Sequence, residues 1–295
     1  QAALPIFTVF LLIILSFYLI NIIFIQENTI KYVSECYFEL TITVVISIFF
    51  LYTSFITTVL NTLKFGNSAI IEYLINNTTL IIPETKLYVY NILGENKKAL
   101  ELAQTIEADN KVPKGFFSKA GLRNTIKLFL ADTFINAKRF NKALEILNSD
   151  ISTYETDIVT IKKALIILQK DNNKEKAIEE GLEAIKINNN DLIRNPAPKK
   201  LEIIIILSDI YLSADMPDKA LEILKPYLSI LSKYPFYSYC KYSKYLISWY
   251  FYIYSKTLIK LNNNTDEIKL YLNKSIELFK SSWPAKCASE LYKSM

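Results

Sequence analysis

The sequence predicts an all-α protein in which a two-helix transmembrane hairpin precedes a solenoid of stacked helix pairs. Two observations carry this prediction. Two long stretches near the start hold no charged residue, and the apolar residues after Lys64 recur at helical spacing. The predicted domains are therefore residues 1–63, which form the hairpin, and residues 64–295, which form the helical part.

The hairpin prediction rests on length and on the absence of charge. Neither 1–26 nor 40–63 contains a charged residue, and a helix needs about 20 mostly apolar residues to cross a bilayer. We expect spans at about 4–25 and about 40–63, joined by a short loop. A buried core helix would need cover on all sides. A signal peptide, the other alternative for the first stretch, has a shorter apolar run.

Charges near the spans predict the orientation. The loop carries only Lys31, whereas Lys64 and the lysines at 86, 97 and 98 follow the second span. The positive-inside bias then places the helical part in the cytoplasm. Hydroxyl and amide side chains share one face of the second span, which is typical of a contact with the first span or with a second copy in a homo-oligomer. They are Thr43, Ser47, Ser54, Thr57 and Asn61.

The composition argues against a catalytic or metal-binding role for this chain. Histidine is absent, which removes the commonest general base and metal ligand. The three cysteines are scattered and the five glycines are far apart, so neither a zinc site nor a phosphate-binding loop is indicated. Residues 64–230 hold 23 basic and 22 acidic residues, too even a balance for a nucleic-acid surface. We expect no enzyme activity, catalytic residue, metal or cofactor.

Five related segments in the helical part predict repeats. Their anchoring residues stand 44, 34, 43 and 48 residues apart, which suits a 34-residue helix pair with longer connections of about 10 to 14 extra residues. Breaker-rich stretches at 111–115 and 188–198 would supply two of these connections. A generic helical bundle is the alternative. The five segments begin Asn96-Lys-Lys-Ala99, Asn141-Lys-Ala143, Glu175-Lys-Ala177, Asp218-Lys-Ala220 and Asp266-Glu-Ile268. The candidate repeats span about 80–113, 119–153, 154–190, 198–233 and 234–281.

Residues from about 80 to about 280 resemble the tetratricopeptide-repeat family. Its pattern places Leu, a small residue and an aromatic in the first helix, then Ala and a large apolar residue in the second. Two sets match: Leu130, Ala131, Phe134, Ala143 and Leu147, and then Leu207, Ser208, Tyr211, Ala220 and Leu224. The resemblance implies stacked helix pairs with a concave surface lined by the first helices.

The layout of the whole chain is similar to the bacterial HemY N-terminal family. The shared features are two closely spaced spans, a partly alternating loop at 24–40, and helical repeats after them. The chain departs from that family in having only Lys64 where a dense basic run is usual. The resemblance implies a bacterial inner-membrane protein with cytoplasmic repeats and a link to haem (tetrapyrrole) synthesis.

The predicted function is that of a membrane-anchored scaffold that binds a protein partner on its concave surface. Alternatives are an envelope-assembly or secretion component with repeats outside the cytoplasm, or a non-catalytic accessory subunit of a membrane enzyme or transporter. The aromatic stripe Tyr242, Tyr245, Trp249 and Tyr252 is interpreted as packing between repeats, not as a ligand cage. The candidate binding residues are Thr125, Asp132, Lys162, Gln169, Glu202 and Asp209.

Overall fold

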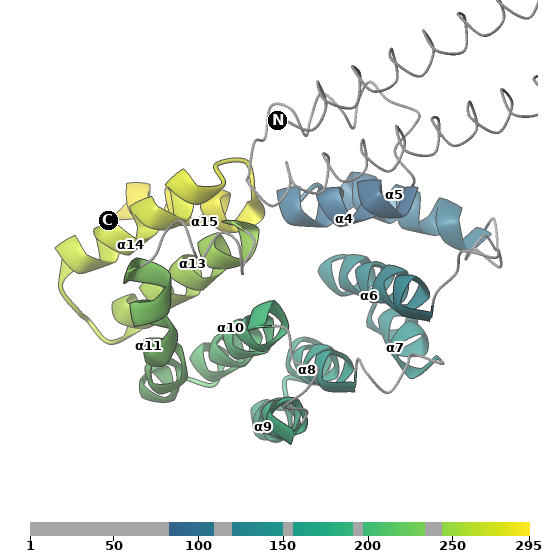
Figure 1. Ribbon diagram of the computed structural model, residues 1–295, viewed down its shortest axis with the longest axis horizontal. Helices are drawn as coiled ribbons and strands as arrows, with labels where there is room; N and C mark the ends of the chain where they lie inside the picture. The colour runs from purple at the N-terminus through teal and green to yellow at the C-terminus, as the bar shows by residue number, and fades with distance from the viewer. Residues whose placement is uncertain (1–82, 109–119, 150–155, 191–196, 234–243) are drawn as a thin grey trace, which may run out of the picture. The chain divides into compact units, whose positions relative to one another are not determined.

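Helices make up all the secondary structure in the part of the chain that the computed structural model describes, namely residues 83–108, 120–149, 156–190, 197–233 and 244–295 (Figure 1). The all-α prediction is confirmed for these ranges. The helices are α4 (Pro83–Leu93), α5 (Asn96–Ala108), α6 (Ala120–Asn136), α7 (Phe140–Asn148), α8 (Thr156–Ile166) followed by the π-helical turn η2 (Ile167–Asp171), α9 (Lys174–Asn190), α10 (Ala197–Ser213), α11 (Pro217–Lys233), α13 (Lys244–Lys260), α14 (Thr265–Leu278) and α15 (Trp283–Ser294).

Consecutive helices pack as pairs. The pairs are α4 with α5, α6 with α7, α8 with α9, α10 with α11, and α13 with α14. We call α4, α6, α8, α10 and α13 the first helices and their partners the second helices. Each first helix from α4 to α10 contacts the next first helix along the chain. Each second helix from α5 to α11 also contacts the first helix of the next pair. The contacts between first helices bring side chains of successive first helices close together.

A left-handed residue stands in the turn of every described pair. These residues are Gly94, Lys138, Asn172, Asp215 and Asn262, with φ angles of 72°, 57°, 51°, 63° and 53°. In four of the turns the next backbone N–H donates to a carbonyl five residues earlier, which satisfies the end of the first helix. The four bonds are Glu95 to Tyr90, Arg139 to Phe134, Met216 to Tyr211 and Asn263 to Leu258. The fifth turn, at Asn172, follows the π-helical turn η2 instead.

The five sequence segments all lie at the start of second helices. Their anchoring residues are buried: Ala99, Ala143, Ala177 and Ala220 are 0% exposed and Ile268 is 3% exposed. Small side chains let a second helix approach its partner closely. The connection expected at 188–198 differs, because α9 continues to Asn190 and α10 begins at Ala197. Asn188 lies within α9, where its buried amide donates to Asp157 Oδ2 at 2.7 Å.

Helix α15 follows the last candidate repeat and was not predicted. It packs on α13 and α14, and it also reaches the first described pair. Lys286 Nζ donates to the carbonyl oxygen of Leu93 at 2.8 Å. A Cβ added to Gly94 would come within 2.8 Å of Trp283 Cβ. The first and last described helices therefore meet although 193 residues separate the bonded groups.

The two predicted membrane spans, at about 4–25 and about 40–63, lie outside the described residues. So do the predicted connection at 111–115 and Tyr242 of the aromatic stripe. None of the helices within the described ranges has the length and hydrophobicity needed to cross a membrane.

Overpacking at Ala143 is expected to destabilise the helix pairs. Ala143→Leu inserts a large side chain at a fully buried contact, and such insertions cost about 1–3 kcal/mol of unfolding free energy. Urea unfolding of the full chain in detergent, followed by tryptophan fluorescence, measures the change. The exposed Glu145 is the matched control on the same helix, and Glu145→Gln should stay within about 0.5 kcal/mol of the parent chain. Equal losses of unfolding free energy in both variants would contradict the close packing at Ala143.

Candidate functional site

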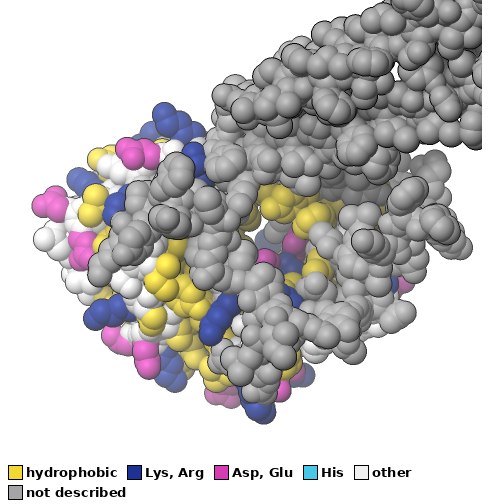
Figure 2. All heavy atoms as spheres, viewed as in Figure 1, with side chains coloured by type: hydrophobic (Ala, Val, Ile, Leu, Met, Phe, Trp, Pro, Cys, Tyr) yellow, Lys and Arg dark blue, Asp and Glu magenta, His cyan; other side chains and the backbone are white. Residues whose placement is uncertain are grey.

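A cavity of about 610 Å³ opens among the first helices. Its lining comes from α4, α6, α8, α10 and α13, with η2 and the first residue of α15 completing the wall. This volume lies within the range typical of ligand-binding sites. Figure 2 shows a hollow in which hydrophobic side chains surround acidic and basic ones. The cavity exists because consecutive first helices present their side chains toward a common space.

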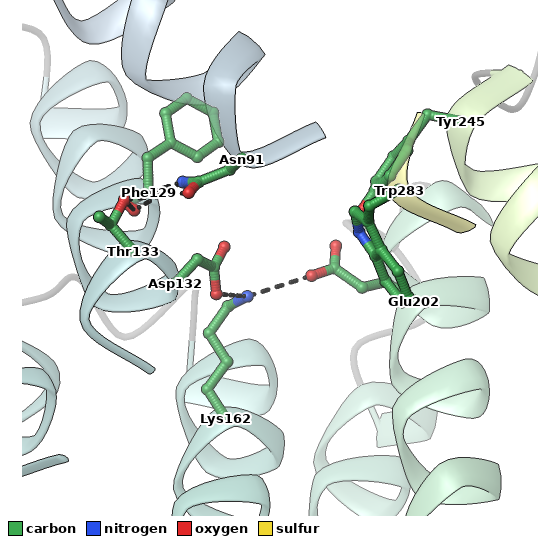
Figure 3. A network of polar contacts seen from close by, with 8 residues as sticks. All are labelled: Asn91, Phe129, Asp132, Thr133, Lys162, Glu202, Tyr245 and Trp283. Carbon is green, nitrogen blue, oxygen red and sulfur yellow. Dashed lines mark hydrogen bonds and ion pairs between the residues drawn. The ribbon is translucent and has the colours of Figure 1, made fainter. Parts of the chain in front are cut away.

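An ion triad of one buried lysine and two partly exposed carboxylates lies in this cavity (Figure 3). Lys162 of α8 is only 4% exposed. Its Nζ donates to Asp132 Oδ1 of α6 at 2.5 Å and to Glu202 Oε1 of α10 at 3.2 Å. With both carboxylates ionised, the one ammonium between them leaves the triad with a net charge of −1. The triad also joins three successive first helices through side chains rather than through backbone contacts.

The pKa values in the triad reflect competition between burial and charge. Burial alone would lower the pKa of Lys162, but the charges of Asp132 and Glu202 outweigh it and raise that pKa above its ordinary value. Burial raises the pKa of Asp132, and the attraction of Lys162 offsets this only in part. Lys162 is therefore firmly protonated at neutral pH. A protonated amine has no lone pair for use as a nucleophile or a general base.

The same two carboxylates act on the phenols of two tyrosines that line the cavity. Burial, followed by the negative charges of Glu202 and Asp132, raises the pKa of Tyr88 to about 12. Burial also raises the pKa of Tyr245 well above its ordinary value, and Glu202 and Asp132 add to that increase. Tyr88 belongs to α4 and Tyr245 to α13, so the negative charge of the triad acts on side chains from both helices.

Aromatic rings form two of the cavity walls. On one side Tyr245, Trp249 and Trp283 cluster: Trp283 Nε1 donates to the Tyr245 hydroxyl at 2.9 Å, and the rings of Trp249 and Trp283 are 5.5 Å apart. On the other side Tyr88 of α4 stacks on Phe129 of α6 at 4.5 Å. All five side chains line the cavity, so the triad is bordered by π faces.

Neighbouring polar contacts hold this arrangement in place. The amide of Asn91 donates to the Phe129 carbonyl oxygen at 3.1 Å and to Thr133 Oγ1 at 3.0 Å, which ties α4 to α6. Asp209 of α10 pairs with Lys256 of α13 at 2.7 Å. This repeats the pattern of Asp132 and Lys162, in which a first-helix aspartate binds a lysine of the next first helix.

The structure brings together most of the residues that the sequence suggested. Asp132, Lys162 and Glu202 form the triad, and Gln169 and Asp209 line the same cavity. Thr125 lies in α6, but its side chain is outside the described part. Lys162 is buried rather than exposed, because two carboxylates compensate its charge. The binding role of the six residues stays a prediction.

The sequence interpretation missed Tyr88, Phe129 and Trp283, and it treated the Tyr245–Tyr252 stripe as packing. Contacts with Trp283 do connect α13 to α15, yet Tyr245 and Trp249 also line the cavity. One signal was available. The chain contains two tryptophans, Trp249 and Trp283, and tryptophan is prominent in binding sites.

Within the described ranges, no group of three or more His, Cys, Asp and Glu side chains is placed to hold a metal ion. The arrangement instead offers a charged, aromatic-walled space suited to non-covalent binding. Comparisons with models of protein families, with curated proteins and with solved structures find no match to this chain. The tetratricopeptide-repeat and HemY resemblances therefore rest on the residues quoted above.

Proposed function

We propose that the chain is a membrane-anchored helical-repeat scaffold that binds a segment of a partner protein in the cavity among its first helices. The observation that carries this proposal is the cavity itself, with its ion triad and aromatic walls. Anchoring is inferred from the uncharged stretches 1–26 and 40–63. The paired helices, with a buried alanine near the start of four of the five second helices, support a tetratricopeptide-like solenoid.

Preorganisation supports binding as the role of the cavity. Asp132, Lys162 and Glu202 are already held by mutual ion pairs, and Tyr245 is held by Trp283. Side chains ordered before binding lose little conformational entropy when a partner arrives. Trp and Tyr are also the side chains that most often carry binding energy at interfaces. The cavity is thus built to hold an incoming group without rearrangement.

The proposed location is a bacterial inner membrane with the repeats in the cytoplasm, inferred from charge placement and from the HemY resemblance. The proposed connection with haem synthesis rests on that resemblance and on no residue of the cavity. An enzyme of that pathway is accordingly the first partner to look for.

Site-specific photocrosslinking in cells tests the scaffold function. A benzophenone amino acid at Gln169, exposed in the cavity lining, should give adducts with a partner protein. The same group at Leu182, 48% exposed on α9 and absent from the cavity lining, is the control. After carbonate washing, the chain and its adducts should remain in the membrane pellet, since the predicted spans would hold them there.

Adducts of the same size and yield from both positions would contradict a partner site in the cavity. Release of the chain into the carbonate supernatant would contradict membrane anchoring. Mass spectrometry of the Gln169 adduct identifies the partner and the partner segment that reached the cavity.

A further inference from the structure

We propose, building on the scaffold function above, that the cavity receives a lysine or arginine side chain of the partner, held by Glu202 and Asp132 between the aromatic rings of Trp249, Trp283 and Tyr245. Three features of the cavity indicate this group: its negative charge, the carboxylate oxygens that Lys162 does not engage, and its aromatic walls.

The cavity carries negative charge that its own residues do not compensate. Lys162 is shared by Asp132 and Glu202, which leaves one negative charge over. The other ions of the lining are matched: Lys199 pairs with Asp157 at 2.6 Å, and Asp209 pairs with Lys256 at 2.7 Å. A carboxylate in a partly desolvated space is stabilised by a nearby cation. An incoming cation would supply the positive charge that balances the triad.

Acceptor atoms are available to receive that cation. Asp132 Oδ1 and Glu202 Oε1 are the oxygens engaged by Lys162. In Figure 3, the second oxygen of each carboxylate points away from Lys162 into the space between Phe129 and the Tyr245–Trp283 pair. Two carboxylate oxygens directed into one space suit an ammonium, or the fork of a guanidinium group.

The aromatic walls favour the same ligand. A Lys or Arg cation within about 6 Å of a Trp or Tyr ring is attracted by the negative π face. Trp249, Trp283 and Tyr245 provide three such rings in the cavity lining, and Figure 3 shows Tyr245 and Trp283 beside Glu202. An anion would meet uncompensated carboxylates, and a purely apolar group would leave them desolvated without a partner. A cation interacts favourably with both the aromatic rings and the carboxylates.

The surroundings indicate a side chain of a polypeptide rather than a free amine. The exposed amides of Asn136 and Gln169 also line the cavity. An amide side chain offers a donor and an acceptor together, as a peptide group does. The cavity of about 610 Å³ also exceeds what one basic side chain fills. It can therefore hold the backbone beside that side chain.

Fluorescence titration of the full chain in detergent tests this assignment directly, because both tryptophans of the chain line the cavity. The probes are blocked pentapeptides, Ala-Ala-X-Ala-Ala, with X as Lys, Arg, norleucine or Glu, at constant ionic strength. The Lys and Arg peptides should bind about tenfold more tightly than the norleucine and Glu peptides. Spermidine, a free polyamine, should bind more weakly than the basic peptides.

A matched pair of variants locates the effect. Glu202→Gln removes the excess negative charge and should weaken binding of the Lys peptide about tenfold. Glu222→Gln makes the same change at an exposed site of α11 outside the cavity. Its affinity for the Lys peptide should stay within about twofold of that of the unmodified chain. Urea unfolding of both variants verifies that they fold. The comparison among peptides on the unmodified chain needs no variant.

Equal affinity for the Lys and norleucine peptides, no fluorescence response to any basic peptide, or an undiminished response in Glu202→Gln would overturn the inference. Tighter binding of spermidine would overturn the assignment to a polypeptide. These failures are distinct from failure of the scaffold function. If Gln169 forms cavity-specific adducts that Glu202→Gln does not reduce, the scaffold stands and the basic side chain is rejected.

Discussion

Lys162→Met is expected to lower the free energy of unfolding by about 2–4 kcal/mol, less than for a fully buried pair because the side chains of Asp132 and Glu202 keep about a third of their surface exposed. The ammonium of Lys162 is the shared partner of Asp132 and Glu202 in the cavity. Removing it leaves two neighbouring carboxylates without compensation, so repulsion adds to desolvation. Urea unfolding of the full chain in detergent, followed through Trp249 and Trp283, measures the loss.

Asp132→Asn is the matched control within the same triad. The pKa of Asp132 is raised because burial outweighs the attraction of Lys162. For this group alone, a folded-state pKa above the unfolded value means that stability falls as pH rises through that interval. Neutralising Asp132 should therefore change stability by only about 1 kcal/mol, since Glu202 still pairs with Lys162. Equal losses from Lys162→Met and Asp132→Asn would contradict the triad.

These ion pairs limit how the concave surface can be tested. Charge reversal at Asp132 or Asp209 would place a lysine against Lys162 or Lys256, so it would also lower stability. Isosteric neutral substitutions avoid this repulsion. Asp132 and Asp209 thus join neighbouring first helices as well as lining the cavity, and only binding measurements on folded variants separate the two roles.

Gly94→Ala is expected to destabilise the chain by about 2–4 kcal/mol. Gly94 has a φ of 72°, where a Cβ is strained. The added carbon would also approach Trp283 Cβ to 2.8 Å, and an atom so close to the backbone cannot rotate away. The change therefore tests the contact between the first described pair and α15. Urea unfolding measures it.

Gly94→Asn separates the two causes. Asparagine tolerates left-handed backbone, as Asn172 and Asn262 do in the equivalent turns, but it keeps the Cβ that meets Trp283. We expect Gly94→Asn to retain a loss of about 1–3 kcal/mol from overpacking. A variant as stable as the parent chain would show that α15 does not press on Gly94.

Local pattern explains why much of the helical architecture could be predicted. The helical spacing of apolar residues depends on neighbours within a few turns, so it can be recognised in the sequence. The same holds for the recurring alanines at the start of the second helices, Ala99, Ala143, Ala177 and Ala220. The same register placed Asp132, Glu202 and Asp209 on the inner side of first helices. Left-handed backbone at Lys138 was not foreseeable, because lysine carries no preference for it.

The sequence alone indicated the paired helices that precede α15 and the side chains that share a face of a helix, because both follow from spacing along one helix. Only the tertiary structure decided what those side chains meet. Lys162 lies 30 residues from Asp132 and 40 from Glu202, and Trp283 joins Tyr245 across 38 residues. Such contacts depend on how successive pairs pack, a property that no local period encodes. The buried charge and the aromatic walls of the cavity arise from that packing.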